Sequence, residues 1–338
     1  MSDLLTLPRR GRGRQTVEAE SQYQRDLASF CEAVLQFRSR LDFEVSARGW
    51  GYTFEGEGSI QKNDIDLVER LINECRKNGH LPLNICAVDE KRAFENVEHI
   101  DDTSPEEEAQ WIVDYALNAF QDYRPFSFWS DKPYYLQTVV EKTDLKSLYR
   151  AISHRFHIPI ANAGGWGDLH VRASMMERFR DWEAEGKQCV LLYCGDHDPG
   201  GLCISSFLRS NMAELSGTVG WSPDNLIIDR FGLNRDYIDA HGLVWIENLI
   251  TNKGKDLADP KHPDHFKPYV QDYIREHGKR KVEGNALLKN PEAGRDLYRQ
   301  TILKYIDPDA PLAYERSLEP ARETVRAEVQ RLLAEDAL

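Results

Sequence analysis

The spacing of apolar residues changes along the chain. In the N-terminal part they recur every three or four positions, as on one face of a helix. From about position 130, short apolar runs alternate with helical patterns, which is typical of strands and helices in turn. The expected strands are residues 134–140, 158–165, 188–194 and 225–233, and the expected helices between them are residues 144–157, 168–186 and 202–215. This order, with short connections, predicts an α/β fold: a parallel sheet flanked by helices on both faces.

The N-terminal part shows a different order of elements. Helical patterns run from Ser21 to about Phe43 and from about Asn63 to Gly79, with a stretch rich in aromatic residues and glycine between them. An extended apolar stretch over residues 81–89 follows the second helix. Two helices joined by a turn and followed by a strand predict a small winged-helix module.

The length of 338 residues favours two domains over one. We expect a disordered tail over residues 1–20, a winged-helix domain over 21–125, and the parallel-sheet domain over 126–338 with a C-terminal helical extension. The acidic stretch 89–110 is the expected connector, and Ser104 is placed to cap the helix that begins within it. After a surface loop over 251–265, two further helices are expected, the last over 318–338.

Composition narrows the class of protein. Charged residues make up 29% of the chain and the formal net charge is −13, which argues against an indiscriminate binder of polyanions. An enzyme that gathers its basic groups in one groove, and holds metal ions where its carboxylates face phosphate, stays compatible with this charge. No apolar stretch approaches the roughly 20 residues of a membrane helix, so no membrane association is expected. The six cysteines form no Cys-x-x-Cys pair, which predicts reduced thiols in a cytoplasmic protein.

Acidic side chains directly follow two of the expected strands. Glu141 comes after the strand over 134–140, and Asp196 and Asp198 come after the strand over 188–194. Ligands of parallel sheets gather beyond the carboxyl ends of the strands. Residues two apart in extended chain point the same way, so both aspartates are expected to face one point, with His197 facing outward. Three carboxylates suit a hard divalent cation, Mg²⁺ or Mn²⁺.

Other interpretations of these acids stay open. Aspartate is common in turns, so Asp-x-Asp alone is weak evidence for a metal, and Glu141 also fits an ordinary charge at a strand end. Phosphatase-like chemistry, in which the first aspartate attacks, gives Glu141 no clear place. The chain has neither a phosphate-binding Gly-x-x-x-x-Gly-Lys-[Ser/Thr] loop nor Gly-x-Gly-x-x-Gly, so no nucleotide pocket is expected. The glycine-rich residues 163–168 are expected to form a tight turn between strand and helix.

The two strand ends together form a motif pair. A strand followed by Glu141 and Lys142, and a strand followed by Gly-Asp-x-Asp-Pro-x-Gly, resemble the Toprim domain over residues 135–240. The version here looks most like the topoisomerase VI A subunit, the meiotic double-strand-break transesterase and related bacterial and phage Toprim proteins. The resemblance implies a CAP-like winged-helix domain before the Toprim domain. It also implies that Glu141, Asp196 and Asp198 bind Mg²⁺, and it makes Lys142 a DNA-binding candidate.

The same relatives carry a tyrosine, in a segment like Ser/Val-x-Arg-x-x-Tyr-Tyr, that attacks DNA and stays attached to the 5′ phosphate. In "VSARGWGYTFE", Ser46 and Arg48 match, Tyr52 stands at the second tyrosine, and Gly51 replaces the first. Gly49 and Gly51 are expected to weaken a helix here by about 1 kcal/mol each relative to alanine. Tyr52 is therefore either the nucleophile, with Arg48 holding the scissile phosphate or favouring the phenolate, or a core aromatic residue.

A later stretch, "KVEGNALL", resembles the family's Lys-x-Glu-x-x-Ala-Leu segment, which implies that Lys281 and Glu283 face a DNA groove. The resemblance as a whole implies Mg²⁺-dependent cleavage of double-stranded DNA by tyrosine transesterification, with Tyr52, Arg48 and Glu141 catalytic. It implies a homodimer in which the nucleophile and the metal-binding acids come from different subunits. It also makes an ATPase partner subunit plausible, since the chain shows no ATP site of its own.

Two alternative functions remain open. In the first, metal-activated water attacks in place of Tyr52, and the protein is a Toprim nuclease. In the second, the acids hold only a structural metal in a non-catalytic DNA-binding component of an ATPase-containing complex. Loss of cutting on substitution of both Tyr52 and Asp196 supports transesterification, whereas loss on substitution of Asp196 alone supports the nuclease.

Overall fold

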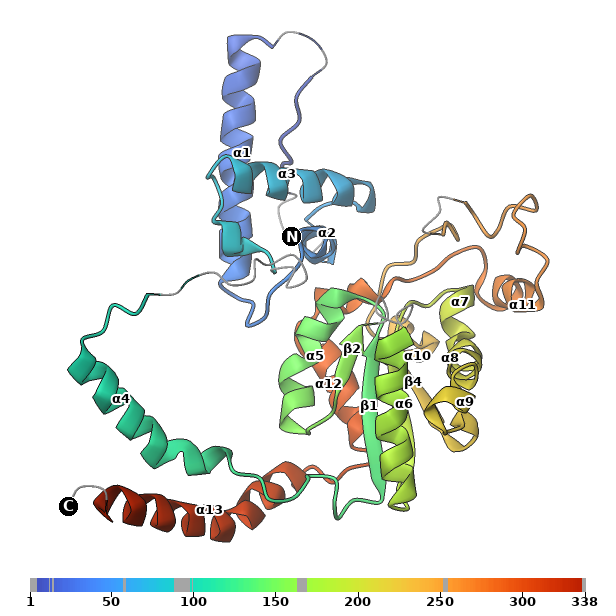
Figure 1. Ribbon diagram of the computed structural model, residues 1–338. Coiled ribbons are helices and arrows are strands. Elements are labelled where there is room, and N and C mark those ends of the chain that lie inside the picture. The colour runs from blue at the N-terminus through green and yellow to red at the C-terminus, as the bar shows by residue number, and fades with distance from the viewer. Residues whose placement is uncertain are drawn as a thin grey trace.

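The structure, a computed structural model, covers most of the chain (Figure 1). The residues it describes are 5–11, 13, 15–56, 59–87, 98, 100–162, 169–251 and 255–335. The predicted turn over 163–168 lies outside them.

A parallel sheet forms the centre of the C-terminal part, as the sequence predicted. Its strands are β1 (Tyr134–Val140), β2 (Ile160–Asn162), β3 (Gln188–Cys194) and β4 (Ile227–Gly232). They lie in the order β2-β1-β3-β4, with every neighbouring pair parallel. In both β1 and β3 every residue after the first is buried, because helices cover the two faces and leave no polar side.

Helices cover the sheet on both sides (Figure 1). They are α5 (Thr143–Arg155), α6 (Leu169–Ala184), α7 (Pro199–Leu202), α8 (Ile204–Ala213), α9 (Ser216–Val219), α10 (Arg235–Ala240) and α12 (Pro291–Ile302). The helix α11 (Pro268–His277) packs against α7, farther from the sheet. The helix α12 packs beside α5, whereas α6 packs on β1 and β3 from the other face. The chain passes from β1 through α5 to β2, which lies on one side of β1. It then passes from β2 through α6 to β3, which lies on the other side of β1.

The N-terminal part is helical in the residues that the structure describes. It contains α1 (Val17–Arg38), α2 (Ala47–Gly56) and α3 (Ile65–Lys77), and the helices expected near α1 and α3 are confirmed. The helix α1 begins inside the stretch predicted to be a tail. The strand predicted over residues 81–89 is wrong for its described part, where Leu83–Ile85 forms a 3₁₀ turn. Up to residue 87, the described N-terminal residues therefore show helices and no strand, and the winged-helix module stays a prediction.

Two glycines that were expected to weaken a helix instead allow it to pack closely. A Cβ atom on Gly51 would lie 2.8 Å from Cγ2 of Ile65 in α3, and one on Gly49 would lie 2.7 Å from a carboxylate oxygen of Asp144 in α5. The intrinsic cost of glycine in a helix is offset by the close contact of α2 with both neighbours. The helix therefore forms, and it carries Tyr52.

Polar contacts join α2 to the sheet domain. Asp144, in the first turn of α5, is buried and accepts hydrogen bonds from the main-chain N–H of Ser46 (2.8 Å) and from its hydroxyl (3.0 Å). Arg295 of α12 forms an ion pair with Asp42 just before α2. The N-terminal helices are thus fastened to the same edge of the sheet domain at which β1 and β3 end (Figure 1).

Two long helices extend away from the sheet domain (Figure 1). They are α4 (Pro105–Asn118), which begins with the predicted capping box at Ser104, and α13 (Ala310–Glu335), which begins earlier than expected and continues through Pro320. They contact each other, and Arg322 of α13 donates to the main-chain oxygen of Tyr123 (3.2 Å), just beyond α4. After the surface loop the structure has α11, α12 and α13, one α-helix more than expected. None of the described helices has the length and apolar character of a membrane span.

Candidate functional site

The ends of β1 and β3 bring two of the predicted acids together. Val140 pairs with Cys194 at the last position of the two strands, so the residues after them lie side by side. The main-chain N–H of Asp196 donates to Oε2 of Glu141 (2.8 Å), and the hydroxyl of Tyr193 lies 3.3 Å from the same oxygen. Glu141 and Asp196 are 55 residues apart in sequence, and the parallel pairing of their strands accounts for their contact.

A lysine ammonium lies between these two carboxylates. Nζ of Lys142 is 2.9 Å from Oδ2 of Asp196 and 3.3 Å from Oε1 of Glu141. Burial raises the pKa of Asp196 to about 6, and the charge of Glu141 adds to this rise while Lys142 opposes it. Burial alone lowers the pKa of Lys142, but the charges of Asp196 and Glu141 outweigh burial and raise it. The lysine therefore supplies the positive charge that two adjacent acids require.

Asp198 has a different environment from Asp196. Its Oδ1 accepts a hydrogen bond from the main-chain N–H of Gly201 (2.6 Å), and the residue caps the short helix α7. Burial raises the pKa of Asp198, and the bond from Gly201 partly offsets that rise. Within the described part of the chain, no three His, Cys, Asp or Glu side chains are already spaced as a metal-binding group. Glu141 and Asp196 form a contacting pair, and Asp198 is engaged by the neighbouring helix.

The donor set nevertheless suits a divalent ion. Oxygen atoms of carboxylates are the ligands that Mg²⁺ and Mn²⁺ prefer. Oε1 of Glu141 and Oδ2 of Asp196 both face one cationic group, the ammonium of Lys142, so a cation position already exists between them. Asp198 is close enough that the charge of Asp196 raises its pKa. These residues can hold a metal ion once the ammonium of Lys142 has moved out of the position between the two carboxylates.

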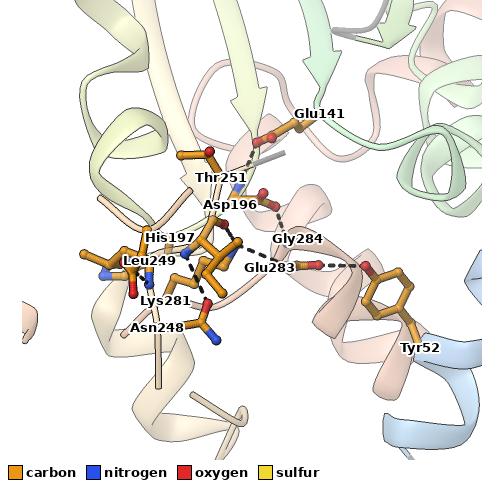
Figure 2. A network of polar contacts seen from close by, with 12 residues as sticks. Tyr52, Glu141, Asp196, His197, Asn248, Leu249, Thr251, Lys281, Glu283 and Gly284 are labelled. Atoms are coloured by element: carbon orange, nitrogen blue, oxygen red, sulfur yellow. Dashed lines mark hydrogen bonds and ion pairs between the residues drawn. The ribbon is translucent and has the colours of Figure 1, made fainter. Parts of the chain in front are cut away.

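A second segment of chain holds the loop 196–198 in place. The main chains of His197 and Val282 pair as an antiparallel bridge, with His197 N–H donating to Val282 (2.8 Å) and Val282 N–H donating back (3.1 Å). The N–H of Gly284 donates to Oδ1 of Asp196 (2.6 Å). The stretch "KVEGNALL", singled out in the sequence, therefore lies directly against the acidic loop (Figure 2).

His197 does not face outward, contrary to the prediction. It is 2% exposed, its Nδ1 bonds the main-chain oxygen of Leu233 (2.7 Å), and its ring packs against Trp245, Tyr273 and His277. Burial lowers the pKa of His197 to about 4, which keeps the ring neutral near pH 7. The strand ends at Cys194, so the alternation of side chains that the prediction assumed does not continue to residue 197.

Tyr52 lies at the far end of the same network. Its hydroxyl donates to Oε2 of Glu283 (2.7 Å), and Glu283 immediately precedes Gly284, which binds Asp196. Figure 2 shows this sequence of contacts from Glu141 through Asp196 and the segment 281–284 to Tyr52. Burial first, and then the charge of Glu283, raise the pKa of Tyr52, so its phenol is protonated at neutral pH.

Arg48 flanks Tyr52 rather than the acidic pair. Its guanidinium lies 5.9 Å from the centre of the Tyr52 ring, and it forms ion pairs with Asp66 (2.8 Å) and Glu69 (3.0 Å) of α3. Half of its side chain is exposed to solvent. Lys281 donates to the main-chain oxygen of Ile250 (2.7 Å) and lies 3.5 Å from a carboxylate oxygen of Glu283.

A pocket in the surface opens beside the tyrosine. Its wall includes Tyr52, Glu283 and Lys289, but neither Glu141 nor Asp196. The pocket therefore approaches the tyrosine end of the network, whereas the acidic pair lies outside its wall.

Sequence reasoning missed two groups that hold the acidic loop. Arg230, on β4, donates from Nη2 to the main-chain oxygen of Asp196 (2.9 Å) and from Nε to that of Gly201 (2.9 Å). The hydroxyl of Tyr273 donates to the main-chain oxygen of His197 (2.9 Å). An arginine inside the apolar strand "NLIIDRFGL" is a signal that could have been noticed, whereas nothing near Tyr273 in the sequence marks its contact.

Comparison with protein-family models, with curated proteins and with solved structures gave no match to this chain.

Proposed function

We propose that this protein cleaves DNA strands in a Mg²⁺-dependent reaction, with Tyr52 as the nucleophile, in the manner of topoisomerase VI A-like Toprim proteins. One observation carries the proposal. The hydroxyl of Tyr52 and the carboxylates of Glu141 and Asp196 belong to one network of contacts, although they come from three distant parts of the sequence.

Each residue of the network has a role in the proposed reaction. Glu141, Asp196 and Asp198 are the groups that would hold Mg²⁺ or Mn²⁺. Such an ion withdraws charge from a phosphodiester and stabilises a leaving oxygen. Arg48, whose side chain is half exposed beside Tyr52, is placed to bind a phosphate, and Lys281 and Glu283 flank the path between the two ends.

Glu283 is the group that receives the proton of Tyr52. The phenol is a poor nucleophile while protonated, and its raised pKa means that the proton must leave as the attack occurs. In the step, the O–H bond of Tyr52 breaks, its proton passes to Glu283, and the phenol oxygen bonds to phosphorus. The bond from phosphorus to the 3′ oxygen breaks, and that oxygen takes a proton from water to leave as a 3′-hydroxyl.

The proposed test uses supercoiled plasmid with Mg²⁺ or Mn²⁺. We expect the wild type to cut and to remain attached to 5′ ends, and we expect Tyr52→Phe and Asp196→Ala each to cut at least about a thousandfold more slowly. Tyr115→Phe is the matched control, because Tyr115 is an exposed tyrosine of α4 away from the network. Cutting by Tyr52→Phe at the wild-type rate would remove the tyrosine from the mechanism.

Hydrolysis by a metal-dependent Toprim nuclease is the second candidate. It is favoured by the burial of Tyr52, which is 8% exposed, with its hydroxyl engaged by Glu283. The same assay separates the two, because a nuclease loses cutting only in Asp196→Ala and leaves no protein on the DNA. If the wild type and both variants retain DNA without cutting it, the protein is instead a DNA-binding component, such as a partner of an ATPase subunit.

Mixing of variant subunits tests whether the nucleophile and the metal-binding acids act within one chain or across a dimer. In the relatives, the nucleophile and the acids come from different subunits of a dimer. Here Tyr52 contacts Glu283 of its own chain. We therefore propose that each chain of the homodimer, which the resemblance implies, carries a complete site. We expect an equimolar mixture of Tyr52→Phe and Asp196→Ala, refolded together, to stay inactive. Recovery of about a quarter or more of wild-type cutting would show that the halves act across the dimer.

A further inference from the structure

In Glu141 and in Asp196, the two acids at the strand ends, the two carboxylate oxygens have two different kinds of partner. One oxygen of each is held by the protein: Oε2 of Glu141 by the N–H of Asp196, and Oδ1 of Asp196 by the N–H of Gly284. The other oxygen of each, Oε1 and Oδ2, faces the ammonium of Lys142. The pair therefore has two oxygens that are hydrogen-bonded to main-chain N–H groups and two that share the ammonium of Lys142 as their cationic partner.

The position of Lys142 is partly enclosed. About a quarter of its side chain is exposed, and the side chain of Asp196 is 9% exposed. At this depth the ion pair is poorly screened by water, so its loss leaves two buried negative charges close together. The chain satisfies its acidic pair without a metal, and Lys142 is the group that allows it to do so.

We propose that Lys142 is a resident counter-cation that a divalent metal ion must displace from between Glu141 and Asp196. This inference rests on the metal site of the proposed function. The two oxygens that face Lys142 are the ones a metal has to take, since the other two are bound to main-chain N–H groups. An ammonium group and a divalent cation repel each other and do not share one position. Lys142 thus sets the affinity of the site by competition, and its displacement frees a positive charge near the strand ends.

The test measures Mn²⁺ binding to the metal-stripped protein without DNA, from the electron paramagnetic resonance signal of free Mn²⁺. We expect Lys142→Met to bind Mn²⁺ about tenfold more tightly than the wild type, because the competing cation is gone. Lys304→Met is the matched control, since Lys304 forms an ion pair of the same length, 2.9 Å, with Asp229 away from the site. The control should bind Mn²⁺ as the wild type does.

Thermal unfolding provides a second measurement on the same proteins. Without metal, Lys142→Met should melt below the wild type, and Mn²⁺ should raise its melting temperature by more than it raises that of the wild type. Lys142→Arg keeps the charge and should retain weak, wild-type-like Mn²⁺ binding, which covers the case in which Lys142→Met fails to fold. A general loss of structure cannot tighten metal binding.

The outcomes separate this inference from the proposed function. Tighter binding by Lys142→Met, including binding by this variant alone, supports displacement. Binding by the wild type, with equal or weaker binding by Lys142→Met, overturns displacement and leaves the metal site standing. If no variant and no wild-type protein binds Mn²⁺, the metal site fails and this inference fails with it. If Lys142→Met does not fold, tenfold tighter Mn²⁺ binding by Lys142→Arg than by the wild type overturns displacement, whereas wild-type-like binding by Lys142→Arg supports it.

Discussion

Gly201→Ala is expected to lower the free energy of unfolding by about 2–3 kcal/mol and to abolish the proposed binding of Mn²⁺ at the strand ends. A Cβ atom at this position would collide with the main-chain oxygen of Asp196 and lie 3.3 Å from Oδ1 of Asp198. The first obstacle is backbone, and Arg230 holds that same oxygen of Asp196, so no side-chain rotation relieves the collision. The loop that carries both aspartates has to move.

The neighbouring glycine gives a matched control. A Cβ atom on Gly200 meets only Oδ1 of Asp198, at an ordinary 3.5 Å, so Gly200→Ala should stay within about 0.5 kcal/mol of the wild type. Both variants are to be compared by urea unfolding and by Mn²⁺ binding. Equal stability of the two variants would contradict the close packing of Gly201 against the loop.

Asp144→Ala is expected to cost about 2 kcal/mol and to loosen the N-terminal helices from the sheet domain. The change leaves the main-chain N–H of Ser46 without its acceptor inside the junction between α2 and α5, and it removes packing beneath Gly49. Limited proteolysis between the two parts should become faster in step with the loss of stability. Unchanged proteolysis would show that other contacts hold the two parts together.

Asp144→Asn is the control, and it also tests the charge. Its amide oxygen can still accept from Ser46, so most of the stability should remain. Burial raises the pKa of Asp144, and the bonds from Ser46 only partly oppose this. The native state therefore holds this proton to higher pH than the unfolded state does, and this residue's contribution falls as pH rises from its ordinary pKa through the raised value. Unfolding measured across that range should show a flatter pH dependence for Asp144→Asn than for the wild type.

The strands were predictable because they follow a simple rule. Helices on both faces demand continuous apolar runs, and the runs over 134–140 and 188–194 coincide with β1 and β3. Parallel strands end at one edge, so the contact of Glu141 with Asp196 could also be foreseen from the sequence. Asp198 before Pro199 is a recognisable start of a helix, and attention to that pattern would have anticipated its capping role.

What the sequence could not supply depends on contacts between distant segments. The bond from Tyr52 to Glu283 joins residues 231 positions apart, and no local pattern at either end specifies its partner. The position of Lys142 between two acids depends on which rotamers the packed loop allows. In the described residues 81–87, the predicted strand is absent for a local reason, because Pro82 precedes a single 3₁₀ turn over Leu83–Ile85.

The lysine between the two acids has an electrostatic consequence for any phosphodiester. With Glu141, Asp196 and Asp198 charged, three carboxylates and one ammonium give the metal-free cluster a formal charge of −2, which would repel a phosphodiester. One divalent ion would bring the charge of the cluster to zero and remove that repulsion. Ion and nucleic acid should therefore bind with positive cooperativity, each raising the affinity of the other by the same factor.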